Sequence, residues 1–387
     1  MPPPAQGFPD IRVSVLRQRC QVTHTSLFAF ISNLCPNRQV AGGALEGPAG
    51  DSGLDEDTAG PTAGTLPTPG TAAEPGETTG PGETAAIPGE TAAPGIAVAA
   101  EVSLAVAAKA SGENFPVALR VLPGAWRAHL MALYGFARLT DDLGDEPLPG
   151  LPSDADAETV MATRLKLLDD LQQDVAKIYD GGQPELPAIQ ALRKTVDECG
   201  IPRQPWDDLI QANRQDQLVK RYATYGDLTK YCELSANPVG QAVLYIVGAA
   251  TPERLLLSDS ICTALQLAEH WQDVAEDLAN GRIYLPLEDL ASFGVTEADL
   301  AQPAAGPAVI KLMMFETGRA RQLLNEGAPL IGTLRGAARL AISGYVAGGR
   351  AALSAIAKAG YDTLRQTPKP GKAATIAGLV SCYVRGR

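Results

Sequence analysis

From about Ile96 to its C-terminus, the chain carries apolar residues at helical spacing and no run of alternating polar and apolar residues. Apolar positions three and four apart define one face of an α-helix, whereas alternation at every second residue would define a half-buried strand. The pattern therefore predicts an all-α fold. A helical region of this length suits a single large domain, residues 96–387, whose helices surround a deep central cavity.

Glycine and proline separate the periodic segments, so individual helices can be predicted. The expected helices or helix groups span residues 125–143, 222–247, 251–278 and 306–365, the last forming a C-terminal pair interrupted near Pro329 and Gly332.

Residues 1–95 have a different composition. From Ala41 to Gly95 the chain is dominated by Gly, Pro, Ala, Thr and Glu, and the unit Pro-Gly-Glu-Thr recurs from Pro75 onward. Such a stretch buries too little apolar surface to offset the entropy of ordering it. We therefore predict a low-complexity, disordered tail. Its composition favours a solvated linker over the alternative, a tail that binds a partner.

The charge and the cysteines exclude several classes of protein. A formal net charge of -12 argues against broad nucleic-acid binding, which needs a basic surface. The six cysteines form no CxxC pair, so neither a zinc site nor a disulfide framework is indicated. No run of about 18 apolar residues is present, and no membrane-spanning helix is expected. A cytoplasmic protein with reduced cysteines fits best.

Two acidic motifs stand out within the helical region. Asp141 and Asp145 are four residues apart, and Asp273 and Asp277 repeat that spacing, with Glu269 four residues earlier. On an α-helix this spacing places the carboxylates on one face, one turn apart. Like charges so placed repel each other, which calls for a compensating cation.

Carboxylate oxygens favour Mg²⁺, which retains water and bridges to substrate phosphates. Two such helices facing each other could hold metal ions that clamp a diphosphate and promote its departure as a leaving group. Arg138 and Arg282 lie near the motifs and could bind the diphosphate or neutralise the carboxylates. The competing interpretation is two solvated acidic helix ends; their apolar flanks favour the metal site.

Other catalytic chemistries find little support. His129 is expected to be a helix-surface or core residue, and His270 lies off the acidic stripe, so metal ligation by it is not expected. No Ser-His-Asp arrangement, P-loop or dinucleotide-binding glycine motif is visible, which argues against acyl transfer, ATP use and a Rossmann cofactor.

From about Glu113 to Ile356 the chain resembles the squalene/phytoene synthase family, and within it most closely the bacterial hydroxysqualene synthase branch of hopanoid biosynthesis. The stretches that carry the resemblance are ENFPV at residues 113–117, YGFARLT at 134–140 before the first acidic motif, YCELSANPVG at 231–240, and WQDVAED at 271–277 followed by GRIYLP at 281–286.

The resemblance implies an isoprenoid-synthase-type fold and a carbon–oxygen lyase that ionises presqualene diphosphate and adds water to give hydroxysqualene, without NADPH. It implies that Tyr231 and Tyr284 line the reaction chamber and steer the cation. The implied Mg²⁺ ligands are Asp141, Asp145, Glu269, Asp273 and Asp277, and the implied diphosphate-binding residues are Arg138, Arg282 and Gln272.

The chain departs from the family pattern at Glu269, where an asparagine is usual, and at His270, where an aromatic residue is usual. Two alternatives therefore stay open. One is a sibling transferase that condenses two prenyl diphosphates to presqualene diphosphate, phytoene or dehydrosqualene. The other is a catalytically silent subunit that binds a prenyl lipid. In each case we expect transient contact with the inner face of the membrane and partner enzymes of the same pathway.

Overall fold

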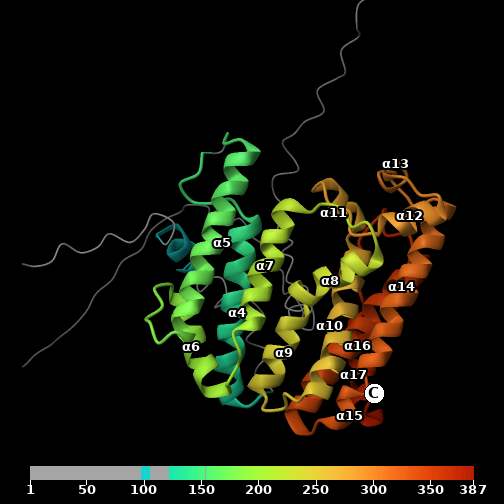
Figure 1. Ribbon diagram of the computed structural model, residues 1–387. Helices are drawn as coiled ribbons and strands as arrows, with labels where there is room; N and C mark the ends of the chain where they lie inside the picture. Colours follow the sequence, from blue (N-terminus) through green and yellow to red (C-terminus); the bar gives the residue numbers. More distant parts are fainter. Residues whose placement is uncertain (1–96, 105–121, 153) are drawn as a thin grey trace, which may run out of the picture. The chain divides into compact units, whose positions relative to one another are not determined.

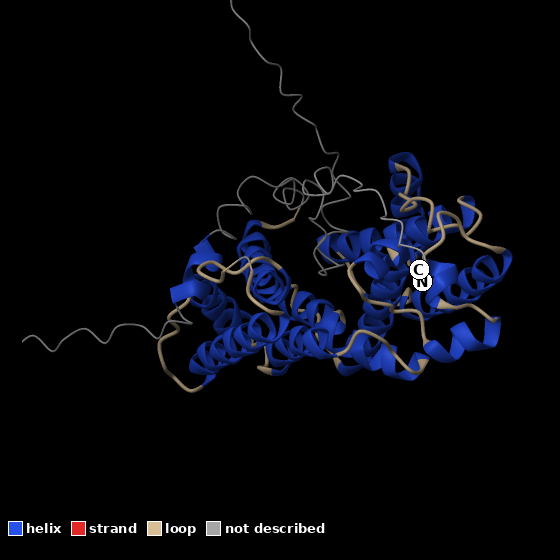
Figure 2. Cartoon of the chain, turned by 90° about the horizontal axis from the view of Figure 1, so that it is seen from above, coloured by secondary structure: helices blue, strands red, loops and turns tan. Residues whose placement is uncertain are grey.

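The computed structural model describes residues 97–104, 122–152 and 154–387, and these are helical apart from connecting loops and one isolated β-bridge between Arg221 and Ile283. Figures 1 and 2 show this helical arrangement, which confirms the predicted all-α fold. The predicted tail and the ENFPV stretch lie outside the described residues, so the predicted boundary near residue 96 stays a prediction.

The labelled helices run in the order given in Figure 1. They are α4 (Gly124–Asp145), α5 (Ala157–Tyr179), α6 (Pro187–Cys199), α7 (Gln204–Leu218), α8 (Tyr225–Ser235), α9 (Asn237–Ile246), α10 (Pro252–Gln272), α11 (Val274–Ala279), α12 (Leu287–Phe293), α13 (Glu297–Leu300), α14 (Pro307–Gly327), α15 (Leu330–Thr333), α16 (Gly336–Lys358) and α17 (Lys372–Arg385).

The predicted segments correspond to these helices. Residues 125–143 fall in α4, residues 222–247 form α8 and α9, and residues 251–278 form α10 and most of α11. The C-terminal pair is α14 and α16, with the short α15 at the predicted interruption. No individual helix was predicted for residues 157–218, 287–300 or beyond 365, so α5, α6, α7, α12, α13 and α17 were not anticipated.

Helix α10 is a central packing element, because α8, α9, α14, α15 and α16 all contact it. Gly240 on α9 shows how close one of these contacts is. A Cβ atom there would lie 2.4 Å from Cys262 Sγ and 2.5 Å from Ser258 Oγ. Only glycine lets α9 approach α10 this closely without displacing those side chains.

A capping box and a glycine define two of the helix ends. Thr224 forms a capping box with Asp227 at the start of α8, satisfying backbone N–H groups that the helix itself leaves unpaired. Gly200 ends α6 with φ 65°, a left-handed conformation that costs glycine little.

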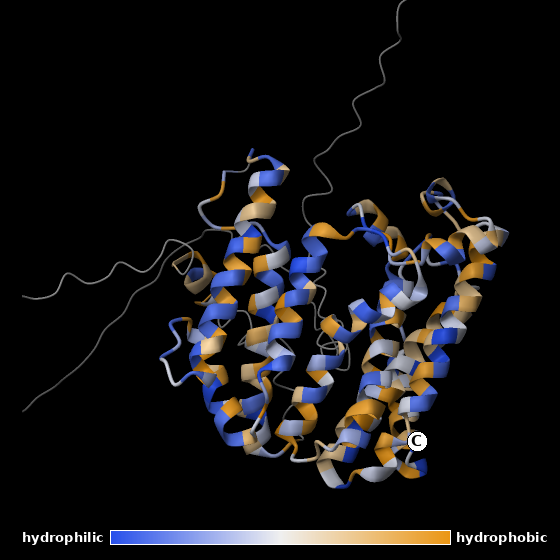
Figure 3. Cartoon of the chain, viewed as in Figure 1, coloured by the Kyte–Doolittle hydropathy of each residue, from blue (hydrophilic) through white to orange (hydrophobic). Residues whose placement is uncertain are grey.

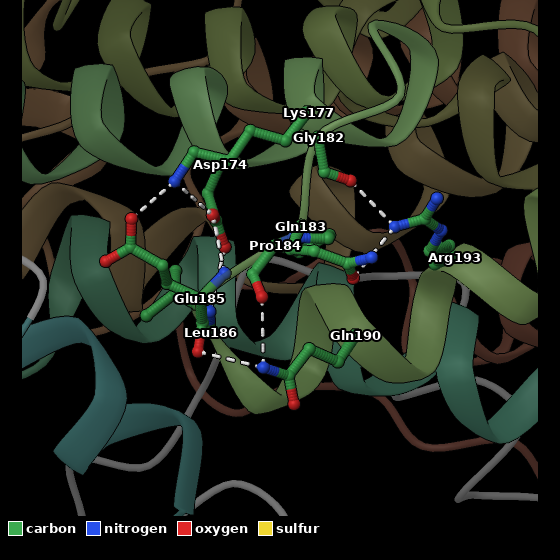
Figure 4. Close-up of polar contacts among 9 residues, drawn as sticks. All are labelled: Asp174, Lys177, Gly182, Gln183, Pro184, Glu185, Leu186, Gln190 and Arg193. Carbon is green, nitrogen blue, oxygen red and sulfur yellow. Dashed lines mark hydrogen bonds and ion pairs between the residues drawn. The ribbon is translucent and has the colours of Figure 1, made fainter. Parts of the chain in front are cut away.

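A buried carboxylate orders the connection between α5 and α6 (Figure 4). Asp174 accepts hydrogen bonds from the backbone N–H groups of Glu185 at 2.7 Å and Leu186 at 2.8 Å. Lys177 also bonds Asp174 at 3.1 Å, so the carboxylate has several partners. The loop is therefore held by charge-assisted bonds.

The long helices carry hydrophobic and hydrophilic residues along their lengths (Figure 3). Within the described residues, α16 alone is long and apolar enough to span a membrane, although no such helix was expected from the sequence. In its most apolar stretch 56 % is buried inside the protein, as in the core helix of a soluble domain. It packs against α10, α14, α15 and α17, so we describe α16 as a core helix.

Candidate active site

The first acidic motif occupies the C-terminal end of α4. Asp141 is only 7 % exposed, and its Oδ1 accepts a hydrogen bond from Asn213 Nδ2 of α7 at 3.4 Å. Its Oδ2 is buried without a hydrogen-bond partner among the described residues. Burial, and next the charge of Asp145, raises the pKa of Asp141 well above its ordinary value. This carboxylate would gain from a nearby cation.

A glycine inside the motif allows α7 to reach it. A Cβ atom on Gly144 would lie 2.5 Å from Asn213 Oδ1, so a larger residue would displace the amide that bonds Asp141. Gln217, one turn further along α7, donates to the Gly144 carbonyl at 3.0 Å. Asn213 therefore orients Asp141, a role that the sequence analysis missed.

Arg138 contacts carboxylates at and just beyond the C-terminal end of its own helix. Its Nε lies 2.7 Å from Asp142 Oδ1, and its Nη2 lies 3.6 Å from Glu146 Oε1. These contacts match the neutralising role considered for Arg138. Its binding of a diphosphate stays a prediction.

The second acidic motif spans a break between two helices. Helix α10 ends at Gln272, and Asp273 has φ −108° and ψ 19° before α11 begins. The one-turn spacing nevertheless persists across the break. The Asp273 N–H bonds the Glu269 carbonyl at 3.0 Å, and the Asp277 N–H bonds the Asp273 carbonyl at 2.8 Å. The expected acidic ladder is therefore retained.

Glu269 couples the two motifs electrostatically. Burial, followed by the charges of Asp273 and Asp277 and then by Asp141, raises the pKa of Glu269 well above its usual value. Because Asp141 belongs to α4, its influence on Glu269 indicates that the motifs face each other. Glu269 Oε2 is a buried atom without a hydrogen-bond partner in the described structure.

The connection between α16 and α17 lies against the second motif. Burial raises the pKa of Asp273 to about 7, helped by Asp277 and Glu276, while a hydrogen bond from Thr367 and the charge of Lys369 act in the opposite direction. The predicted diphosphate ligand Gln272 donates its side-chain N–H to the Pro368 carbonyl of this connection. Its contact with a diphosphate stays a prediction.

Arg282 links the two motifs. Its Nη2 donates to Asp145 Oδ1 at 2.9 Å, while its backbone N–H donates to the Asp277 carbonyl at 2.8 Å. The N–H of Ile283 bonds the Lys220 carbonyl at 3.0 Å, which ties this segment to the end of α7. A cationic side chain is thus held between the motifs, where a phosphate could also reach it.

Aromatic side chains pack beside the acidic groups. The rings of Tyr231 and Tyr284 lie 5.8 Å apart, and Tyr222 stacks on Tyr284 at 5.8 Å. His270 stacks on Tyr284 at 3.6 Å. Burial, and next the charge of Arg282, lowers the pKa of His270 to about 3, so the imidazole is neutral near pH 7. The family resemblance implied roles for Tyr231 and Tyr284 but not for Tyr222.

Asp216 supports this aromatic group from α7. Its Oδ2 accepts a hydrogen bond from the Tyr231 hydroxyl at 2.8 Å, and Asp216 is 4 % exposed. Burial raises its pKa to about 7, against the opposing effects of Arg282 and Tyr231. The sequence analysis missed Asp216. The signal was available, because the buried face of α7 repeats at helical spacing and includes polar residues, at Leu209, Ala212, Asn213 and Asp216.

The acidic residues of the described structure do not form a complete metal cage by themselves. No three Asp, Glu, His or Cys side chains of the described residues gather closely enough to surround one ion. Mg²⁺ usually takes one or two carboxylates and completes its shell with water and substrate phosphates. The carboxylates here are divided between two motifs, and one oxygen each of Asp141 and Glu269 is buried without a hydrogen-bond partner in the described part of the chain. This arrangement suits Mg²⁺ ions that bind together with a diphosphate.

Known proteins of similar sequence point to one family. The family model for squalene/phytoene synthase matches residues 108–373. A hydroxysqualene synthase of Rhodopseudomonas palustris is 32% identical over 224 residues, which are 58% of this chain and 72% of that protein. A phytoene synthase of Arthrospira platensis is also 32% identical, over 231 residues covering 56% of this chain and 71% of that protein.

Solved structures agree with the sequence comparison. The structure of squalene synthase HpnC from Alicyclobacillus acidocaldarius is 37% identical with a TM-score of 0.59, covering 69% of this chain and 95% of that one. A dehydrosqualene synthase at 23% identity has a TM-score of 0.63 over 76% of this chain and 98% of that one, and supports the fold alone. The chain therefore belongs to the squalene/phytoene synthase family, as its motifs indicated.

Proposed function

We propose that this protein ionises presqualene diphosphate with Mg²⁺ and directs water to the resulting cation, giving hydroxysqualene and diphosphate. Members of the family process prenyl diphosphates and generally depend on a divalent metal. The observation that carries the proposal is the pairing of two acidic motifs, joined by Arg282 and Asp145, beside a buried group of tyrosines. Similarity to hydroxysqualene synthases favours this reaction within the family.

The residues divide into two functional groups. Asp141, Asp145, Glu269, Asp273 and Asp277 would hold the metal. Bound Mg²⁺ would neutralise charge that develops on the departing diphosphate. Arg282 already lies between the motifs and can donate to a phosphate oxygen in place of Asp145.

Ionisation also produces a carbocation, which the aromatic side chains would stabilise. The electron-rich faces of tyrosine rings attract a cation. Burial raises the pKa values of Tyr231 and Tyr284 well above the ordinary range, so ionisation of either phenol is disfavoured. Asp216 holds the Tyr231 hydroxyl and so fixes one ring. An apolar surrounding limits early attack by water.

The direct test is to incubate the full-length protein with presqualene diphosphate and Mg²⁺ without NADPH and to analyse the lipid extract by mass spectrometry. Hydroxysqualene that disappears with EDTA is the expected result. Its absence would overturn the proposal.

A second candidate is condensation of two prenyl diphosphates. It is favoured by phytoene synthases as similar to this chain as the hydroxysqualene synthases are. The same assay with farnesyl or geranylgeranyl diphosphate distinguishes it. Conversion of neither these nor presqualene diphosphate would favour a binding subunit without turnover.

A further inference from the structure

The outer face of α17 is apolar and exposed. Ile376 is 63 % exposed, Val380 58 % and Val384 73 %, and they repeat every four residues along the helix. Tyr383 lies beside them at 38 %. Positions four apart share a face of an α-helix. These four side chains, called here the α17 stripe, therefore form one continuous apolar surface.

The opposite face of α17 is firmly packed, so the exposure of the stripe does not come from a detached helix. Thr375 and Cys382 are buried, and α17 packs on α16. Arg339 of α16 donates from Nε to the Tyr383 carbonyl at 2.9 Å. Arg350 of α16 bonds Cys382 Sγ at 3.3 Å. Both arginines hold the C-terminal end of α17, where helix carbonyls lack partners.

The stripe lies in a strongly basic part of an acidic chain. Residues 330–387 contain nine Lys and Arg residues and a single Asp, whereas the whole chain has a net charge of -12. Exposed cations lie in and beside both ends of the helix. They are Lys369 and Lys372 at the start and Arg385 and Arg387 at the end.

A helix with an aliphatic face and basic ends has the chemistry of an interfacial membrane helix. The aliphatic side chains enter the boundary between headgroups and acyl chains, while Lys and Arg attract anionic lipids. We propose that α17 docks this protein on an anionic lipid bilayer through the α17 stripe and the basic residues at its ends.

The charge distribution would also orient the docked protein. The rest of the chain is acidic and is repelled by an anionic surface, so the basic C-terminal region faces the bilayer. Docking would bring the enzyme to where long prenyl chains reside. That purpose rests on the proposed function, whereas binding to lipid can be measured without any turnover.

The test is flotation of the full-length protein with two kinds of vesicle. One is pure phosphatidylcholine, and in the other a third of the lipid is phosphatidylglycerol. We expect strong recovery with the anionic vesicles only, reduced by raised salt. The double variant Ile376→Ser/Val380→Ser should bind about tenfold more weakly, because two aliphatic anchors are lost. Leu218→Ser removes an equally exposed apolar side chain from α7 and should bind like the wild type.

The basic ends are tested with Lys372→Gln/Arg385→Gln, which should lose most of its salt-sensitive binding. Circular dichroism and sedimentation velocity establish that each variant remains folded and report its oligomeric state. Three results would overturn the proposal. They are no recovery of wild type with anionic vesicles, unchanged recovery of both double variants, or stripe variants that convert a dimer into a monomer. None of these bears on whether presqualene diphosphate is converted.

Discussion

Glu269 stands at the position where the resemblance to the family leads one to expect an asparagine. Its carboxylate stands one turn before Asp273 and is buried, with Asp141 of the facing motif contributing to its raised pKa. An asparagine at this position would offer one neutral oxygen. Glutamate adds a negative charge to an already acidic site, so without a cation the site is strained by repulsion.

Replacing Glu269 with Gln should separate these effects. We expect Glu269→Gln to raise the melting temperature in EDTA, because glutamine removes the cost of burying an ionisable carboxyl group among like charges. We also expect it to need about tenfold more Mg²⁺ for half-maximal turnover, because a metal-binding oxygen is weakened. Melting curves with and without Mg²⁺ and a metal titration of the activity measure both. Glu233→Gln, an exposed residue of α8, is the control; equal behaviour of the two variants would contradict this role.

Asp216 should affect turnover in two ways, by holding the Tyr231 hydroxyl and by its negative charge. Asp216→Asn keeps an oxygen that can accept the Tyr231 hydroxyl, so the fold should be preserved. The variant loses the negative charge near Arg282, and we expect kcat to fall about 100-fold. Steady-state kinetics with melting curves test this, with Asp208→Asn on the same helix as the control. Wild-type kcat in Asp216→Asn would refute the assignment.

The acidic residues of the site could be predicted from sequence because their spacing is local. Asp141, Asp145, Asp273 and Asp277 each lie one turn from a partner. Helical spacing places Asn213 and Asp216 on the buried face of α7, but it does not identify the residues that they contact. Their partners, Asp141 and Tyr231, are on other helices, so only the tertiary packing of α7 reveals these contacts.

The contact between α9 and α10 depends on a missing side chain. We expect Gly240→Ala to destabilise the protein by about 1–3 kcal/mol, because the new Cβ would overlap Cys262 and Ser258. Gly135→Ala on α4 is the matched control, since a Cβ there meets nothing within 4 Å. It should be neutral or stabilising by about 0.5–1 kcal/mol through helix propensity. Urea unfolding of both variants provides the comparison, and equal stabilities would contradict the packing argument.

The contact between α12 and α14 should make stability depend on pH. Glu316 is fully buried, and burial, followed by its hydrogen bond with Asp289, raises its pKa to about 8, although Arg319 opposes this. The unfolded chain has the ordinary glutamate pKa of about 4.3. The folded state therefore binds this proton more tightly. Its contribution to stability is full below pH ~4 and is lost as pH rises through 8.

Glu316→Gln should remove that dependence while keeping a neutral side chain of similar size. Between pH 5 and pH 9 we expect the melting temperature of the wild type to fall more than that of the variant. Parallel curves for the two proteins would show that Glu316 does not hold its proton in the folded state.

Helix positions followed from the sequence better than helix interruptions did. The periodic segments gave α4, α10, α14 and α16 because each buries an apolar face. The break at Asp273 was not predicted, because the one-turn spacing of the acidic residues and the i to i+4 backbone hydrogen bonds both continue through it. α17 was not predicted because its large apolar residues, Ile and Val, are exposed. The face that packs on α16 consists of small residues, so the sequence shows no distinct apolar face.

At the scale of the whole molecule, the helices bring two acidic motifs, distant in sequence, together beside a group of buried tyrosines. The fold class and the family followed from the sequence, and comparison with known proteins supports both. The specific reaction did not, because a hydroxysqualene synthase and a phytoene synthase are equally similar to this chain in sequence.

The central proposal is that the two acidic motifs act together in metal-dependent ionisation. The measurement that tests it most directly is release of diphosphate from presqualene diphosphate by wild type, Asp145→Ala and Asp273→Ala, with Mg²⁺ and with EDTA. We predict Mg²⁺-dependent release by the wild type and a loss of at least about 100-fold in each variant. Turnover that persists in EDTA, or that survives either substitution unchanged, would contradict the claim.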